Sequence, residues 1–288
     1  ASWYGLNNIG WNAAKQLQGK ELSYNNLLDL ESALSTILEF EYDQKQNPET
    51  NLNVAVILKH NNPCGAALAD SPSEAFRKAL DCDSTSAFGG IVAFNNKLDL
   101  AAAKLLSNIF LECVVAPSFD KDALEILKNK KNLRLLQLNK ENLKTGKEST
   151  FKSILGGVLE QDNDNEVEQP NEWSCVTQAK PKTEEFNDLI FSWKICKHIK
   201  SNAIVVSKNQ KTIGIGAGQM NRVGAAKIAL ESAKEYANDA VLASDGFFPF
   251  SDSVEIANQY GIKSIIQPGG SVRDQESIDM CNKLGISM

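Results

Sequence analysis

The sequence predicts an α/β fold made of two similar halves. Short apolar runs typical of strands alternate with longer segments in which apolar residues recur at helical spacing. The run at 54–58 is continuously apolar, as in a strand that is buried on both faces. Glycine-rich turns follow several strand runs and precede helices, which is typical of layered α/β proteins. A comparable order of elements returns after residue 171, and we therefore expect two halves.

In the first half, residues 1–19 show no periodicity and predict no complete element. A polar linker at 41–53 leads into the strand at 54–58, which is expected to deliver Lys59 and His60 into a loop ending at Pro63-Cys64-Gly65. Helices are expected at 27–38, 74–80 (capped by Ser71 or Ser73), 98–108 and 121–128, and strands at the end of 81–94, at 113–116 and at 133–138.

Residues 139–171 are irregular and become strongly acidic toward their end, with one strand candidate at 154–159. This stretch predicts a boundary between a first α/β subdomain at 1–160 and a second at 161–288. In the second half, helices are expected at 184–200, 222–236, 252–260 and 275–284, and strands at 203–207, 212–215, 240–243 and 264–266.

Composition and charge exclude several classes of function. The chain has 288 residues, 42% of them hydrophobic, and a net charge of −6, which argues against a nucleic-acid partner. We expect no association with a membrane, because no apolar run approaches the ~18–20 residues of a bilayer span. The six cysteines include no C-x-x-C pair, so they predict neither a disulfide framework nor a zinc site, and we expect a reducing, cytoplasmic compartment.

Lys59 and His60 are the first candidates for chemistry, because a base and a cation follow a buried strand and a glycine nearby allows close approach. The alternative is that both side chains only cap a strand at the surface. Cys64 lies close enough in sequence to pair with His60 as a nucleophile, although packing in the core is the preferred interpretation. We assign His198, the other histidine, to the carboxyl end of a helix.

Glycines at 214–218 follow a strand and precede the helix that Arg222 opens, a context that favours an anion. The stretch is not a dinucleotide fingerprint, because Gln219 stands where the third glycine belongs. A turn that needs glycine for its geometry alone is the alternative. Asp245 and Asp252 flank three phenylalanines after another strand, and residues 201–202 stay undecided between a helix cap and a ligand contact.

Six motifs in one order resemble the AICAR transformylase family, a domain found in bifunctional purine biosynthesis proteins. They read K-H-N-N-P-C-G-A (59–66), S-A-F-G-G-I-V-A (86–93), S-N-A-I-V (201–205), G-I-G-A-G-Q-M-N-R (214–222), S-D-G-F-F-P-F (244–250) and Q-P-G-G-S (267–271). The resemblance covers about residues 19–288. It implies two cytidine-deaminase-like, three-layer subdomains with mixed sheets and no zinc.

The resemblance also implies a function: transfer of a formyl group from 10-formyltetrahydrofolate to the 5-amino group of AICAR, without a metal, in a homodimer with shared active sites. His60 is then the general base and Lys59 the stabiliser of the oxyanion. The implied contacts to AICAR are Gly89, Glu112, Asn202 and Arg222, and those to the folate are Val223, Phe247, Asp252 and Ser271.

The sequence departs from this family in the segments that it lacks. The cyclohydrolase domain, an R-Y-G-x-N-P-H-Q stretch and a C-terminal R-H-F-type tail are not present, and the last two are expected to help bind the nucleotide. One alternative is therefore a fragment that binds nucleotide or folate without turnover. A deaminase-like hydrolase is the other, although it would need metal ligands that the motifs do not supply.

Overall fold

A mixed ten-stranded sheet forms the centre of the computed structural model, which describes residues 2–5, 9–40, 52–143, 149–164 and 169–288. The strand order is β1-β6-β5-β4-β2-β3-β10-β9-β11-β12, with parallel pairs at β4–β5, β5–β6 and β11–β12. The strands are β1 (Lys15–Gln18), β2 (Asn53–Lys59), β3 (Asn62–Ala69), β4 (Gly90–Phe94), β5 (Leu111–Ala116), β6 (Arg134–Gln137), β9 (Ile204–Lys208), β10 (Lys211–Gly216), β11 (Val241–Ser244) and β12 (Ser264–Ile266).

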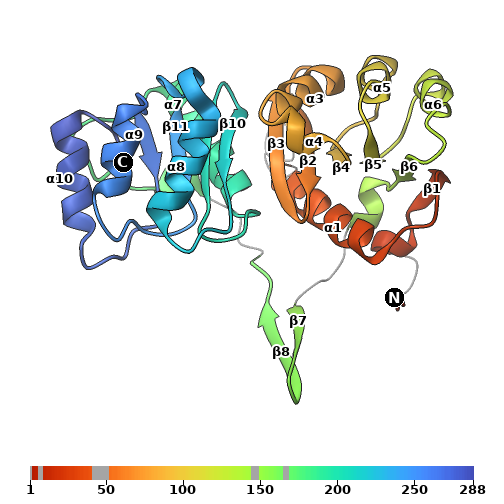
Figure 1. Cartoon of the computed structure of the whole chain (residues 1–288), viewed down its shortest axis with the longest axis horizontal. Helices are drawn as coiled ribbons and strands as arrows, with labels where there is room; N and C mark the ends of the chain where they lie inside the picture. The colour runs from red at the N-terminus through yellow and green to blue at the C-terminus, as the bar shows by residue number, and fades with distance from the viewer. Residues whose placement is uncertain (1, 6–8, 41–51, 144–148, 165–168) are drawn as a thin grey trace.

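Helices cover both faces of this sheet and give three layers (Figure 1). The α/β prediction is therefore confirmed, whereas the likeness to cytidine deaminase stays a prediction. The α-helices are α1 (Tyr24–Leu38), α3 (Pro72–Leu80), α4 (Ser84–Ala87), α5 (Leu100–Ser107), α6 (Lys121–Leu127), α7 (Thr183–Cys196), α8 (Arg222–Ala233), α9 (Asp252–Gln259) and α10 (Asp274–Leu284). Short 3₁₀ turns lie at Gly10–Asn12, Lys140–Leu143, Pro170–Glu172 and Lys234–Ala237.

Three clusters of buried apolar side chains hold the layers together. One lies under α3, α5 and α6 on one side of strands β2 to β6, and another lies under α8, α9 and α10 in the second half. The third joins the halves, because it contains residues of α1 and of α7; Phe40 and Phe191 pack there with ring centroids 5.7 Å apart. Each half thus has a core of its own and shares a further one.

The segment after Lys59 differs from the prediction. Residues 63–65 lie in strand β3, not in a loop, and the connection is a two-residue hairpin turn at His60 and Asn61. Both turn residues have positive φ angles, 54° and 59°, as tight hairpin turns require. The sequence did not predict β3 as a strand because it is rich in small residues. The strand requires small residues because α3 packs so closely against it that a Cβ on Gly65 would overlap the carbonyl oxygen of Ala79.

The two halves are joined edge to edge through β3 and β10. Their ladder contains one pair, Lys211 opposite Ala67, supplemented by hydrogen bonds between Thr212 Oγ1 and the backbone of Ala66. Beyond this point the strands separate toward the start of β3. There, the side chain of Asn62 accepts a hydrogen bond from the backbone N–H of Lys200 at 3.0 Å.

A separate hairpin of β7 (Ser149–Ile154) and β8 (Gly157–Asp162) projects away from both halves of the molecule, which we call the two lobes below (Figure 1). Only the strand candidate at 154–159 was expected here. The expected boundary between residues 160 and 161 falls within β8, and the division into two subdomains stays a prediction. Strand β1 in the N-terminal segment was also not predicted from the sequence. Within the described ranges, no helix is long and apolar enough to cross a membrane.

Candidate functional site

All ten residues expected in the site lie at one edge of the large sheet. The pairing directions place the carboxyl ends of β2, β10, β11 and β12 at the same edge as the amino ends of β3, β4, β5 and β9. The expected residues lie in or next to these ends: Lys59, His60, Gly89, Glu112, Asn202, Arg222, Val223, Phe247, Asp252 and Ser271. This edge, called the site edge below, brings together segments from both halves.

Lys59 and His60 lie where the β2–β3 hairpin reaches the site edge. Nζ of Lys59 donates a hydrogen bond to the carbonyl oxygen of Phe88 at 2.6 Å. A Cβ on the following residue, Gly89, would lie only 3.9 Å from this ammonium, so Lys59 and Gly89 are neighbours. His60 is exposed, and among the described residues no hydrogen bond involves its ring. The imidazole is therefore open to a ligand.

Asp29 of α1 holds the turn that carries His60. Its Oδ1 atom accepts a hydrogen bond from the backbone N–H of Asn61 at 2.7 Å. The Asn61 side chain, turned so that its nitrogen faces Asp29, adds a bond of 3.0 Å to the same oxygen. Sequence reasoning did not find Asp29, because it lies on a helix some thirty positions earlier with no motif around it.

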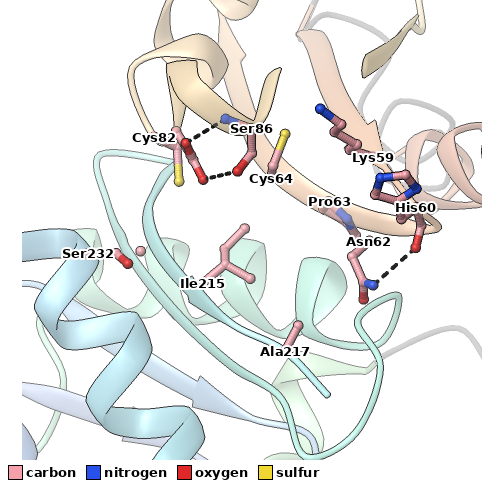
Figure 2. Close-up of a pocket in the computed structure, with 12 residues that line it drawn as sticks. Lys59, His60, Asn62, Pro63, Cys64, Cys82, Ser86, Ile215, Ala217 and Ser232 are labelled. Carbon is pink, nitrogen blue, oxygen red and sulfur yellow. Dashed lines mark hydrogen bonds between the residues drawn. The ribbon is translucent and has the colours of Figure 1, made fainter. Parts of the chain in front are cut away.

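A cavity of about 440 Å³ lies between the lobes and opens beside Lys59 and His60 (Figure 2). We call it the lobe-interface pocket. One wall comes from the β2–β3 hairpin and the segment after α3, and the other from β10 and α8. Its lining residues are Lys59, His60, Asn62, Pro63, Cys64, Cys82, Asp83, Ser86, Gly214, Ile215, Ala217 and Ser232. The pocket thus brings Lys59 and His60 together with the glycine-rich stretch from Gly214 as far as Ala217.

Cys64 lines this pocket without the properties of a nucleophile. Burial raises the pKa of its thiol to about 12, and the nearby Cys82 and Asp83 act in the same direction. The thiol donates a hydrogen bond to the carbonyl oxygen of Ile57. A thiol in this state provides little thiolate at neutral pH, which agrees with the packing role expected from the sequence.

Arg222 lines a second cavity, of about 340 Å³, which we call the Arg222 pocket. Its lining residues are Asn202, Met220, Asn221, Arg222, Gly246, Phe247 and Pro249. Nη1 of Arg222 forms an ion pair with Oδ1 of Asp245, and both side chains are largely buried. Asp245 therefore offsets part of the charge of Arg222, and the expected role of Arg222 in binding an anionic ligand stays a prediction.

Asn202 and the segment after β10 hold each other at this pocket. The side chain of Asn202 donates to the carbonyl oxygen of Gln219 at 2.7 Å, and its backbone N–H donates to the same oxygen at 3.1 Å. The N–H of Gly218 in turn donates to the carbonyl oxygen of Lys200 at 2.7 Å. Because Lys200 also contacts Asn62, hydrogen bonds connect the two pockets along the site edge.

The other expected residues lie farther apart along the edge. Glu112 forms an ion pair of 2.8 Å with Arg134, at the beginning of β6. Phe247 is 45% exposed in the Arg222 pocket, and Val223 is in the first turn of α8. Asp252 begins α9, and Ser271 lies after β12, where its side chain accepts from the backbone of Arg273. The strands next to Glu112 and Ser271 are seven positions apart in the sheet, which corresponds to at least about 34 Å at ~4.8 Å per strand.

No group of three or more metal-ligating side chains occurs in the part of the chain that the structure describes. The arrangement instead provides an exposed imidazole, an ammonium group, amide groups and an exposed aromatic ring. Such groups can bind a polar ligand with a flat ring and move a proton. The fold and the site edge therefore define an α/β protein in which the candidate site residues gather at one edge shared by two lobes.

Comparisons with known proteins place this chain in a family. A family described as AICARFT/IMPCHase bienzyme matches residues 1–232, and the chain belongs to this family. It is 66% identical to the "Bifunctional purine biosynthesis protein PurH" of Prochlorococcus marinus strains AS9601 and MIT 9312, and 59% identical to that of strain NATL2A. Each alignment covers 100% of this chain and 56% of the relative. The chain thus spans about half the length of these relatives.

Proposed function

We propose that this chain contains the formyl-transfer centre of a purine biosynthesis enzyme. The reaction moves a formyl group from 10-formyltetrahydrofolate to the 5-amino group of AICAR, giving the formylated nucleotide on the way to IMP. Membership of the AICARFT/IMPCHase bienzyme family supports the proposal at the level of the reaction. The observation that carries it is the position of Lys59, His60 and Gly89 together at the site edge.

His60 is proposed as the general base. The amino group of AICAR is a weak nucleophile, because its lone pair is conjugated with the ring and the carboxamide. Imidazole is the side chain whose ordinary pKa lies nearest to neutral pH, so it can take the amine proton as the new C–N bond forms. When the tetrahedral intermediate collapses, the C–N bond to the folate breaks and the folate nitrogen receives a proton. No metal is required in this sequence of steps.

Lys59 is proposed to stabilise the negative charge that develops on the formyl oxygen. An ammonium group has three N–H donors, and one of them is used in the bond to Phe88. The remaining donors can face an oxyanion at the open site edge. Gly89 lies beside this ammonium group, since a Cβ there would be 3.9 Å from the nitrogen, an ordinary contact distance.

The proposed binding residues suggest that two copies of the chain complete the site. AICAR is assigned to Gly89, Glu112, Asn202 and Arg222, and the folate to Val223, Phe247, Asp252 and Ser271. Lys59 and Asn202 are three strand positions apart, which corresponds to at least about 14 Å because β3 and β10 separate at this edge, and Glu112 lies farther still from Ser271. We therefore propose a homodimer in which the first half of one copy faces the second half of the other.

The test is an assay of tetrahydrofolate formation with AICAR and 10-formyltetrahydrofolate. It is run with this chain and with a protein that carries it at the full length of the PurH relatives, and binding of each ligand is titrated separately. Turnover in the longer protein supports formyl transfer. Binding without turnover in both would instead support a binding fragment, and lack of binding to either ligand would contradict the proposal.

A further inference from the structure

Asn62, the first residue of β3, has a side-chain amide that contacts both lobes. Its Nδ2 donates a hydrogen bond to the carbonyl oxygen of His60 at 3.2 Å (Figure 2). Its Oδ1 accepts a hydrogen bond from the backbone N–H of Lys200 at 3.0 Å. A carbonyl can only accept and an N–H can only donate, so the two contacts need a donor and an acceptor. The amide of Asn62 supplies them on separate atoms, and both partners fix its orientation.

The contact with Lys200 spans the place where the two lobes separate. Hydrogen bonds join Ala66 and Leu68 of β3 to the second lobe, whereas the strands are apart at the start of β3. The lobe-interface pocket lies in that opening, with Asn62 in one wall and Ala217 in the other (Figure 2). Asn62 therefore joins the lobes on the side of the joint that faces the site edge.

The part of the second lobe that Asn62 contacts is itself held in place. The carbonyl oxygen of Lys200 accepts a hydrogen bond of 2.7 Å from the N–H of Gly218. Two further bonds run from Asn202 to the carbonyl oxygen of Gln219, so the segment after β10 fixes both ends of 200–202. Lys200 is therefore a firm anchor for the side chain of Asn62.

We propose that Asn62 is a positioning residue that holds the turn carrying His60 against the second lobe. The ring of His60 is exposed and, in the described part of the chain, forms no hydrogen bond, so its place depends on the backbone of its turn. Asp29 fixes that turn from the first lobe through Asn61, and Asn62 fixes it from the second through Lys200. The inference rests on the proposed function for the role of His60 as a base, whereas the contacts of Asn62 do not depend on that role.

The main experiment is a cycle of Asn62→Ala, His60→Ala and the double variant, made in the full-length protein. Asn62→Ala is expected to lower kcat about ten- to a hundredfold, as for loss of two hydrogen bonds, with a small change in the KM for AICAR. Because Asn62 acts through His60, adding the change to His60→Ala is expected to cost less than about twofold. Equal losses in the two backgrounds would overturn the proposal, since a merely structural role does not depend on His60.

A second variant, Asn62→Asp, separates the two contacts. The carboxylate keeps an acceptor for the N–H of Lys200 but has no donor for the carbonyl oxygen of His60. Asn62→Asp is therefore expected to lose less kcat than Asn62→Ala. Equal losses in the two variants, with the contact to Lys200 intact in Asn62→Asp, would show that this contact does not position His60.

Asn96→Ala is the matched control. Asn96 is also half-buried, and its Nδ2 donates two hydrogen bonds, to the carbonyl oxygen of Leu52 at 3.3 Å and to Oδ1 of Asn53 at 3.1 Å. It follows the carboxyl end of β4 and so lies at the edge of the sheet opposite the site edge. Asn96→Ala is expected to keep the wild-type kcat. A loss as large as that in Asn62→Ala would trace the effect to general stability and count against the proposal.

Hydrogen exchange measured without ligand keeps this inference distinct from the proposed function. The amide of Lys200 is expected to exchange faster in Asn62→Ala than in the wild type, and at the wild-type rate in Asn62→Asp and Asn96→Ala. Unchanged exchange in Asn62→Ala would refute the role of the contact between the lobes. A wild-type protein that neither binds nor formylates AICAR would refute only the proposed function.

Discussion

The carboxylate of Glu39, at the end of α1, forms a hydrogen bond with the ring of His198 after α7, with 3.0 Å between Oε1 and Nε2. Nζ of Lys197 lies 3.3 Å from the same oxygen, and both partners belong to the other lobe. Burial acts to raise the pKa of Glu39, but the hydrogen bonds and charges of His198 and Lys197 outweigh it and lower the pKa below its usual 4.5. The sequence assigned His198 only to the end of a helix, whereas it joins the two lobes.

This pair predicts a loss of stability in acid. A carboxyl group whose pKa is lower in the folded state stabilises the fold above its unfolded pKa, and that contribution disappears as the pH falls through the folded value. Glu39→Gln is expected to reduce the free energy of unfolding by about 1–3 kcal/mol at pH 7 and by much less below pH 4. Urea unfolding at both pH values is the measurement. Glu125→Gln, which removes a well-exposed pair with Lys128, should show little change, and an equal effect of the two variants contradicts the prediction.

Substitution of His60 tests the proposed chemical step. His60→Ala is expected to lower kcat by about 10²–10⁴-fold, because general-base catalysis is of that size, with a small change in the KM for AICAR. Lys59→Met is expected to lower kcat by about 10²–10³-fold if its ammonium meets the oxyanion. Steady-state kinetics in the full-length protein measure both. His198→Ala and Lys97→Met are the matched controls; a near-normal kcat for either site variant would remove that residue from the mechanism.

Asp29 provides a test of the turn that carries His60. Asp29→Ala removes the acceptor of the Asn61 N–H, whereas Asp29→Asn retains an oxygen at the same place. We expect the alanine variant to lose about tenfold in kcat, as for loss of one hydrogen bond to a charged group, and the asparagine variant to lose less. Hydrogen exchange of the Asn61 amide should accelerate only in the alanine variant. Unchanged exchange would show that the turn is held by other contacts.

Gly65 offers a test of the close packing between β3 and α3. A Cβ there would overlap the carbonyl oxygen of Ala79, which belongs to a helix backbone and cannot swing aside. Gly65→Ala is expected to destabilise the fold by about 1–3 kcal/mol, as overpacking does. Thermal and urea unfolding measure this, with Gly157→Ala as the control. A stable Gly65→Ala protein would mean that α3 can move away from the sheet at little cost.

The cysteines are expected to differ in reactivity toward alkylating agents. Burial acts to raise the pKa of the Cys175 thiol, but hydrogen bonds with Thr177 and the nearby Lys180 outweigh it and lower that pKa. Cys64 and Cys82 have pKa values raised to about 12 by burial. At pH 7–8, iodoacetamide should therefore modify Cys175 first, and Cys175→Ser should remove the fast phase. Mass spectrometry that finds the first label on Cys64 would contradict this order.

Local patterns of apolar residues were sufficient to predict most helices and strands, but not the strand built from small residues or the strand with exposed side chains. The apolar run of β2 and the helix that Arg222 opens were predicted, because burial on both faces and helical periodicity are visible in sequence. Strand β3 was missed, since glycine and alanine replace the branched residues typical of strands where α3 packs closely. In β1 the side chains are mostly exposed, so no apolar signal marks it.

The site edge was foreseeable only in part. Each expected residue lies in or next to the end of a strand, and that much is local. The order of strands is not local, because the joint between β3 and β10 brings together Ala66 and Thr212, 146 positions apart. The pairing of Arg222 with Asp245 likewise depends on the neighbouring positions of β9, β10 and β11. The roles of Lys59 and His60 therefore stay predictions that rest on family resemblance and on proximity.

The projecting β7–β8 hairpin has a practical consequence. Its side chains from Phe151 to Asp162 are all exposed, and its strands contact mainly each other. A cut at the tip, between Leu155 and Gly156, would break no ladder pair. The two pieces would still share the β3–β10 joint, the Glu39–His198 pair and the apolar cluster around Phe40 and Phe191. The chain is thus suited to a split-protein reporter, in which two separately expressed pieces regain the site edge only when they assemble.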